Sequence, residues 1–268
     1  MPSFIDQIGR NIHLAKPPVR IVSLVPSQTE LLADLGLENQ VVGITKFCVH
    51  PGNWLRTKTI VGGTKQVHLD KVKDLQPDLI IANKEENVRE QIEELAKEFP
   101  VWVSDVNNLD DALKMINSVG KIVDKESTAI AMSNEIKYGF SLLQTTNFKL
   151  QTAYLIWKDP YMTVGGDTFI NNMLSLCGFN NTFASQTRYP VVTKDDLQSC
   201  ELILLSTEPY PFKEKDRTEL QRLLPNSKIV IVDGEMFSWY GSRLLKAPSY
   251  FKQLQDQVLS LVHARGTE

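Results

Sequence analysis

Two soft or borderline ligand types lie close together in the first quarter of the chain. Cys48 and His50 are two residues apart, and His68 follows further on. Thiolate and imidazole groups bind zinc and related transition metals, but a protein metal site usually has three or four ligands. The spacing allows a metal site at Cys48 and His50, or an axial role for His50 toward a metal in a bound complex. It equally allows a buried thiol beside a hydrogen-bonded histidine.

Aromatic side chains follow several of the short apolar runs. Open α/β sheets bind ligands at the carboxyl ends of their strands, and aromatic rings offer large flat areas to a ligand. The alternative for Trp157 and Phe237 is a core position at a strand end. The candidate ligand-binding aromatic residues are Phe47, Trp157, Tyr161, Trp239 and Tyr240.

Basic side chains occur in the same predicted loops. A converging basic set favours an anionic ligand, whereas separate lysines are usually only solvated. Glu85 and Glu86 are interpreted as charges at a helix N-terminus rather than as a catalytic pair. The candidate loop residues are Lys46, Thr64, Lys65, Lys84, Lys158, Arg188 and Arg243.

The composition excludes several classes of function. The chain has 268 residues and a formal net charge of -3, so an extended basic surface for nucleic acid is not expected. The sequence contains neither GxGxxG nor GxSxG, and the segment Gly62-Gly63-Thr64-Lys65 lacks the spacing of a phosphate-binding loop. We expect a binding protein for small molecules, without enzymatic activity and monomeric.

The elements that must position these residues alternate between short β-branched runs and helical patterns, which is typical of parallel α/β sheets. Residues 125–144 carry apolar side chains on one helical face. We therefore predict an N-terminal α/β lobe at 1–121, a helical connection at 122–147 and a C-terminal lobe at 148–268, with a cleft between the lobes. The predicted strands are 20–24, 41–44, 79–82, 101–103, 152–157, 202–205 and 229–232.

Helix boundaries are marked by local signals. Ser27 and Glu30 have the spacing of a capping box, and Gly36 follows as a stop signal. The corresponding helix of the second half is predicted to begin near Asp167 or Thr168 and to end at Gly178. Further surface helices are predicted at 86–98 and 214–223.

The ordered motifs resemble one known family. Residues 20–30, 75–82 and 165–178 are similar to the substrate-binding proteins of ABC importers for cobalamin, ferric siderophores and haem, most of all to the cobalamin receptors. The resemblance covers about residues 20–262. It implies two Rossmann-like lobes joined by one long rigid helix, the class III periplasmic-binding-protein fold. It also implies a metal chelate as ligand, cobalamin or an Fe(III) complex.

The same resemblance implies an ABC permease as partner. In the family, one acidic residue on each lobe contacts arginines of the permease. Asp70 matches the N-lobe position, and Asp195 or Asp196 the C-lobe position.

Three features depart from the family. The family cysteine that pairs with the position of Cys177 has no counterpart near Lys252. Thr64 occupies the position of a tryptophan that lines the pocket of the cobalamin receptors. No secretory signal is recognised. An extracytoplasmic location is expected from the family and a cytoplasmic one from the absent signal. The alternative function is a cytosolic metal- or cofactor-binding protein of the same fold.

Overall fold

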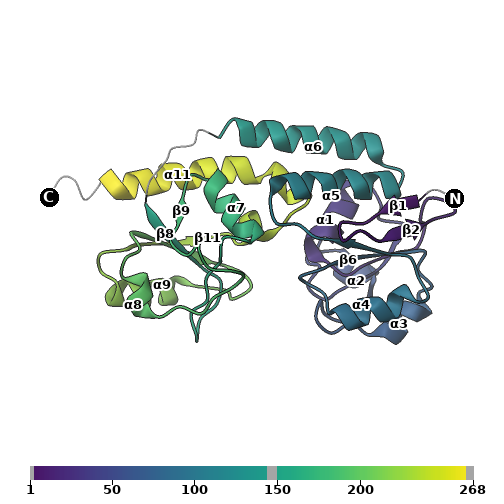
Figure 1. Cartoon of the computed structure of the whole chain (residues 1–268), viewed down its shortest axis with the longest axis horizontal. Coiled ribbons are helices and arrows are strands. Elements are labelled where there is room, and N and C mark those ends of the chain that lie inside the picture. Colours follow the sequence, from purple (N-terminus) through teal and green to yellow (C-terminus); the bar gives the residue numbers. More distant parts are fainter. Residues whose placement is uncertain (1–2, 144–149, 264–268) are drawn as a thin grey trace. The chain divides into compact units, whose positions relative to one another are not determined.

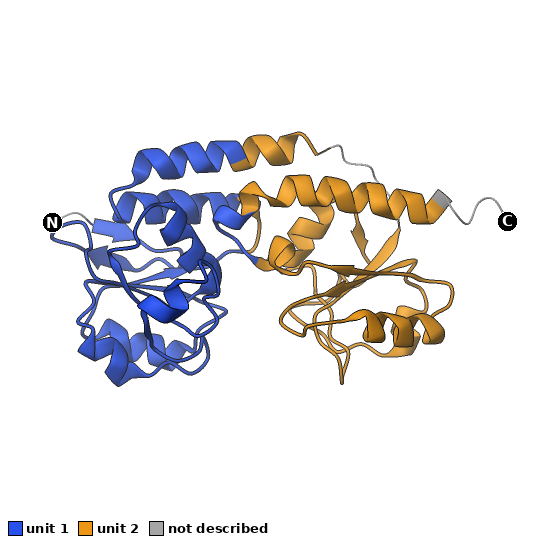
Figure 2. Ribbon diagram, turned by 180° about the vertical axis from the view of Figure 1, so that it is seen from behind, with its two compact units in different colours: residues 1–106, 110–135, 239–243 blue, residues 107–109, 136–238, 244–268 orange. Residues whose placement is uncertain are grey.

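The computed structural model describes residues 3–143 and 150–263, and parts of the predicted helical connection and of both predicted lobes lie outside them. The chain divides into two compact units (Figure 2), made of residues 1–106, 110–135 and 239–243, and of residues 107–109, 136–238 and 244–268. The division falls inside helix α6 (Glu126–Ser141). The boundaries predicted at 121 and 147 stay a prediction.

Unit 1 is built on a five-stranded parallel sheet of order β5-β4-β3-β6-β7. The strands are β3 (Ile21–Ser23), β4 (Val41–Ile44), β5 (Thr59–Ile60), β6 (Leu79–Asn83) and β7 (Val101–Ser104). An antiparallel hairpin, β1 (Ser3–Ile5) and β2 (Asn11–His13), precedes the sheet. The four strands predicted for this half are confirmed, whereas the hairpin and the two-residue β5 are too short to give a hydrophobic period.

The helices of unit 1 lie on both faces of its sheet (Figure 1). Val22, Ile80 and Ala82 share one buried cluster with Val72 and Ile92 from two of these helices. Gly120 approaches Ala129 so closely that a Cβ at Gly120 would overlap it, which brings the last two helices into contact. The helices are α1 (Pro26–Asp34), α2 (Trp54–Thr57), α3 (Leu69–Asp74), α4 (Arg89–Ala96), α5 (Leu109–Ile122) and the first part of α6.

Unit 2 is built on a four-stranded parallel sheet of order β11-β10-β8-β9. The strands are β8 (Gln151–Leu155), β9 (Asn180–Asn181), β10 (Leu202–Ser206) and β11 (Lys228–Val232). All three predicted strands are present, and β9 was missed. The helices are α7 (Phe169–Leu176), α8 (Lys194–Leu197), α9 (Glu214–Leu223), α10 (Glu235–Ser238), the 3-10 turn η1 (Ser242–Leu245), which also includes two residues of unit 1, and α11 (Ala247–His263).

Alternate residues along the strands of unit 2 point into the same hydrophobic core. Ala153, Leu155, Ile203 and Leu205 point to one face, where they cluster with Leu220 of α9. Helix α11 covers the other face (Figure 1). The predicted α/β class with parallel sheets is therefore confirmed. None of the described helices has the length and apolar composition needed to cross a bilayer.

The glycine-rich segment before α7 has a steric explanation. A Cβ at Gly165 or Gly166 would overlap the backbone carbonyls of Gln186 or Ala184, so the two segments pack backbone to backbone. Thr168 then caps α7 by accepting a hydrogen bond from the N–H of Asn171 at 3.2 Å, and Gly178 ends the helix at φ +83°. Both predicted boundaries of this helix are confirmed.

Candidate functional site

The loop after β4 exposes an aromatic ring in unit 1. Phe47 is 50% exposed, and the ammonium nitrogen of Lys46 lies 5.0 Å from its ring centroid. A Cβ at Gly63 would lie 3.1 Å from the same ring, so Phe47 rests on the backbone of the loop after β5. One ring face is thus supported by backbone while half of the residue remains open to a ligand.

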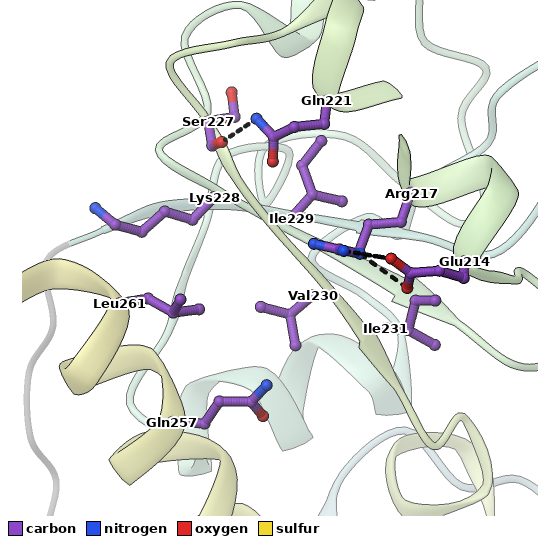
Figure 3. A pocket seen from close by; sticks show the side chains of 10 residues that line it. All are labelled: Glu214, Arg217, Gln221, Ser227, Lys228, Ile229, Val230, Ile231, Gln257 and Leu261. Atoms are coloured by element: carbon purple, nitrogen blue, oxygen red, sulfur yellow. Dashed lines mark hydrogen bonds and ion pairs between the residues drawn. The ribbon is translucent and has the colours of Figure 1, made fainter. Parts of the chain in front are cut away.

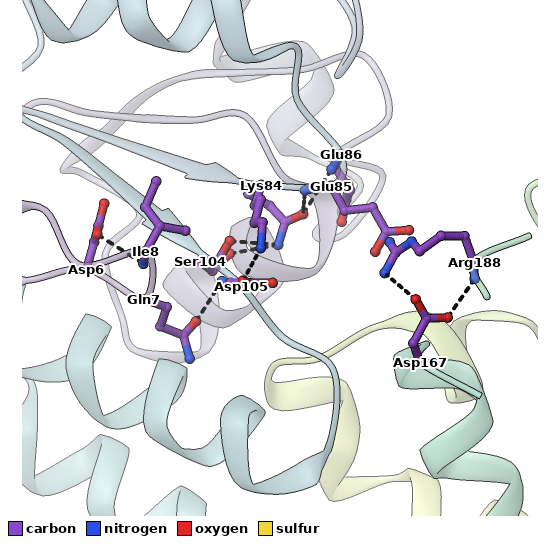
Figure 4. A network of polar contacts seen from close by, with 11 residues as sticks. Asp6, Gln7, Ile8, Lys84, Glu85, Glu86, Ser104, Asp105, Asp167 and Arg188 are labelled. Carbon is purple, nitrogen blue, oxygen red and sulfur yellow. Dashed lines mark hydrogen bonds and ion pairs between the residues drawn. The ribbon is translucent and has the colours of Figure 1, made fainter. Parts of the chain in front are cut away.

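Hydrogen bonds tie the neighbouring strand-end loops together, and Figure 4 shows the one between Lys84 and Asp105. Lys65 Nζ donates to the backbone oxygen of Glu85 at 2.6 Å, and the Thr64 carbonyl accepts from Asn87 at 3.0 Å. Lys84 Nζ lies 2.6 Å from Asp105, although its side chain is 61% exposed. Thr64, Lys65 and Lys84 therefore lie in neighbouring loops, after β5 and β6, at the carboxyl edge of the sheet.

A segment from the C-terminal half, Trp239–Arg243, belongs to unit 1. The His50 ring meets the Trp239 ring edge-on, with centroids 5.4 Å apart. Tyr240 is buried and its hydroxyl donates to Glu86 at 2.6 Å. Burial raises the pKa of Tyr240 well above its usual value. Trp239 is buried to the same extent as Tyr240, at 7% exposure, so both of these predicted ligand-binding rings help to hold the segment, and His50 contacts the edge of Trp239.

The capping box predicted at Ser27 and Glu30 is wrong. Helix α1 begins at Pro26 with Val25 as its N-cap, and no side chain caps it. Glu30 instead forms a buried ion pair with Arg243, with Nε 3.0 Å and Nη2 2.9 Å from its two carboxylate oxygens. Burial raises the pKa of Glu30, and the guanidinium acts against this shift. Arg243, predicted to bind ligand, therefore has its charge directed at Glu30.

The structure does not support a metal site at Cys48 and His50. Cys48 is fully buried, and its sulfur lies 3.1 Å and 3.2 Å from the hydroxyls of Thr29 and Thr45. Burial raises the pKa of the thiol, which disfavours the thiolate that a metal needs. Within residues 3–143 and 150–263, no group of three His, Cys, Asp or Glu side chains is placed to hold a metal ion. All three cysteines, Cys48, Cys177 and Cys200, are free and buried.

Unit 2 presents its own aromatic residue at a strand end. Trp157 follows β8, is 41% exposed, and contacts Tyr210 with ring centroids 5.7 Å apart. Tyr161 is half-buried, and burial raises its pKa. Phe237 is fully buried, so for this residue the core interpretation is confirmed.

Two basic residues of the predicted set are held by acids in unit 2. Lys158 Nζ lies 3.0 Å from Asp216 and 2.7 Å from Glu219, and its side chain is only 13% exposed. The Arg188 N–H donates to Asp167 at 2.6 Å, and its guanidinium lies 3.8 Å from the same carboxylate (Figure 4). Lys158 is therefore a structural cation, and only its acidic partners on α9, distant in sequence, could have revealed this.

The structure separates the two acidic residues predicted together for the C-lobe. Asp196 completes a capping box of α8, because it accepts from the N–H and hydroxyl of Thr193 at 2.8 Å and 2.7 Å. These hydrogen bonds lower the pKa of Asp196. Asp195 is exposed and accepts a local hydrogen bond from the side-chain amide of Gln198 at 3.0 Å. Asp70, in the first turn of α3, is also exposed.

A pocket of about 560 Å³ lies elsewhere in unit 2, along the edge strand β11 (Figure 3). Its walls come from α9 and α11, and Arg217 within it is paired with Glu214. None of the predicted ligand-binding residues lines it. The lining residues are Glu214, Arg217, Gln221, Ser227, Lys228, Ile229, Val230, Ile231, Gln257 and Leu261.

Comparison with known proteins places this arrangement in a family. Residues 21–202 match the family of periplasmic binding proteins. An uncharacterised ABC transporter substrate-binding lipoprotein of Bacillus subtilis is 27% identical over 90% of this chain and 81% of its own length. A vitamin B12-binding protein of Photorhabdus laumondii is 25% identical over 94% of this chain and 93% of its own.

Solved structures show the same fold. The periplasmic catecholate-siderophore binding protein of Vibrio cholerae superposes with a TM-score of 0.79 at 13% identity, covering 94% of this chain and 99% of its own. The sheets, the strand-end loops and the match over most of the sequence agree, and the chain belongs to the periplasmic binding protein family.

Proposed function

We propose that this protein is the substrate-binding component of an ABC importer and that it binds a metal chelate outside the cytoplasmic membrane, with a corrinoid as the first candidate. Membership of the periplasmic binding protein family supports a receptor role. The relatives named above include a lipoprotein of an ABC transporter and a vitamin B12-binding protein. The family match and these relatives do not favour the non-transport alternative.

The observation that carries the ligand class is the pair of exposed aromatic residues at strand ends. Phe47 is 50% exposed and Trp157 is 41% exposed, each directly after a parallel strand of its own sheet. What singles out these two rings is their place at the ends of parallel strands, because open α/β sheets bind ligands at that edge. A corrin or a porphyrin offers a flat apolar face that matches such rings.

A ferric siderophore or haem is the second candidate, because lysines accompany Phe47. The strand-end loops of unit 1 contain three exposed lysines, Lys46, Lys65 and Lys84. Their ammonium groups suit the carboxylates or oxygen donors of an anionic chelate. A corrinoid would bind mainly through the aromatic rings, whereas an anionic chelate would bind mainly through the lysines.

Calorimetric titration tests the proposal directly. The purified protein is titrated with cyanocobalamin, haemin and a ferric catecholate complex at low and moderate salt. A dissociation constant below micromolar, about -8 kcal/mol or stronger, for any one of them supports a chelate receptor. Affinity for cyanocobalamin that does not depend on salt favours the corrinoid, and affinity that falls with salt favours an anionic chelate. Absence of heat with all three removes the proposed ligand class.

We also propose that Asp70 and Asp195 present the receptor to its permease. Both carboxylates are exposed and lie in short helices, where they are free to accept paired contacts from arginine. The charge reversals Asp70→Lys and Asp195→Lys, made together, are expected to abolish uptake and to leave chelate affinity unchanged. Glu135→Lys, at an exposed position of α6, is the control charge reversal. Unchanged uptake in the double variant would remove the docking assignment.

A further inference from the structure

The segment Trp239–Arg243 is fixed to unit 1 at each end and in its middle. Tyr240 donates to Glu86, and the backbone of Gly241 lies against α1, where an added Cβ would be 2.8 Å from the Ser27 carbonyl. Arg243 pairs with Glu30 of the same helix. The site of unit 1 therefore includes a piece of chain that follows residues 136–238 of unit 2 in the sequence.

The Glu30 and Arg243 pair is almost completely shielded from solvent. Its side chains are 10% and 8% exposed, and the guanidinium carbon lies 5.2 Å from the centroid of the Trp239 ring. His50 meets the same ring at 73°. One chain of contacts thus runs from a carboxylate of α1, through a guanidinium and an indole, to the imidazole of a predicted ligand-binding residue.

Stability alone is a weak reason for this arrangement. A buried ion pair is often no more stabilising than apolar side chains of the same volume, whereas a lone buried charge is costly. The Arg243 guanidinium lies beside both carboxylate oxygens of Glu30 and 5.2 Å from the Trp239 ring centroid, so the pair limits where the indole can lie. The main effect of the Glu30 and Arg243 pair is therefore to set the position of the Trp239 ring.

We propose that Glu30 and Arg243 are positioning residues that fix the buried Trp239 ring, and through it the half-buried His50, which contacts the chelate. Neither residue contacts the ligand in this scheme. The inference rests on the proposed function, because the surface that it orders is the proposed chelate surface of unit 1. It also changes the role assigned to Arg243 from binding an anion to supporting an aromatic ring.

Fluorine NMR of protein labelled with 5-fluorotryptophan tests the positioning without a ligand. The chain contains four tryptophans, and Trp239→Phe assigns the resonance of interest. Three forms are compared with wild type: Glu30→Gln, the double variant Glu30→Met with Arg243→Met, and the control Glu93→Gln. The control changes an exposed Arg–Glu pair on α4.

We expect the Trp239 resonance to move in Glu30→Gln and in the double methionine variant and to stay in place in Glu93→Gln. The double variant removes both charges at similar volume, so its melting temperature is expected to remain near that of wild type. Its dissociation constant for cyanocobalamin, or for whichever of haemin and the ferric catecholate binds wild type, is expected to rise about tenfold, as when the support of a ligating side chain is lost.

Two results would overturn the inference. A Trp239 resonance that stays in place in both Glu30 variants would show that the pair does not set the ring. An affinity equal to that of wild type, in a double variant whose resonance has moved, would show that the orientation is not used for binding. If no chelate binds wild type, the proposed function fails by itself, and the NMR comparison still decides whether the pair positions Trp239.

Discussion

Truncating Phe47 should weaken chelate binding without unfolding the protein. An aromatic side chain has about 150–250 Å² to bury, and half of this residue is exposed. The area available to a ligand is therefore about 75–125 Å², which at about 25 cal/mol per Å² corresponds to about 2–3 kcal/mol when fully covered. With partial coverage, Phe47→Ala is expected to cost about 1.4–2.5 kcal/mol, a rise in the dissociation constant of roughly 10- to 70-fold.

Titration calorimetry and thermal unfolding of the same samples provide the test. The melting temperature of Phe47→Ala should change little, because surface substitutions usually alter stability by no more than about 0.5 kcal/mol. Tyr138→Ala is the matched control, since Tyr138 on α6 is an even more open ring, at 65% exposure, and does not follow a strand. A chelate that binds wild type and Phe47→Ala within about twofold would refute the assignment of the exposed ring to ligand contact.

Three further outcomes follow from the contacts. Lys158→Met should lower the free energy of unfolding in urea by about 2–4 kcal/mol, because the Asp216 carboxylate, which is 3% exposed, loses its cation. The control Glu219→Gln changes the 57% exposed partner and should lower the free energy of unfolding by less than about 1 kcal/mol. Gly120→Ala should lower the melting temperature despite the better helix propensity of alanine, since the added Cβ meets Ala129. The lowered pKa of Asp196 gives stability that is present above the unfolded value of 3.8 and is lost as the pH falls through the folded pKa. In Asp196→Asn the free energy of unfolding should therefore depend less on pH below pH 3.8 than it does in wild type.

Most of the parallel sheets could be predicted from local pattern. Strands buried on both faces appear as short runs of β-branched residues, and all seven runs are strands in the structure. The missed elements are two-residue edge strands and a hairpin, which hold too few residues for a period. The helix predicted at 86–98 begins later, at Arg89, because Asn83 accepts from the N–H groups of Glu85 and Glu86 and shapes a turn there.

The candidate site was predictable only where position after a strand decides exposure. Phe47 is open as that rule predicts, and Trp157, for which a core position was the alternative, is open as well. Trp239 and Tyr240 also follow a strand and are nevertheless buried. The charged residues were harder, because their partners lie far away in sequence. Glu30 has capping-box spacing but pairs with a residue 213 positions later, and Lys158 pairs with a helix 58 positions later. Local spacing contains no information about such pairs.

These partners divide the predicted ligand residues into two kinds. Tyr240 and Arg243 are buried and held by acids of unit 1, so moving them would break hydrogen bonds that water does not replace. Phe47 and Lys46 have open faces and few restraints. A chelate would therefore meet a support that is formed before binding, and ordering that support costs little on association. Differences in affinity between chelates should then arise at the exposed ring and lysines, which is why substitutions there are the sharper probes of ligand identity.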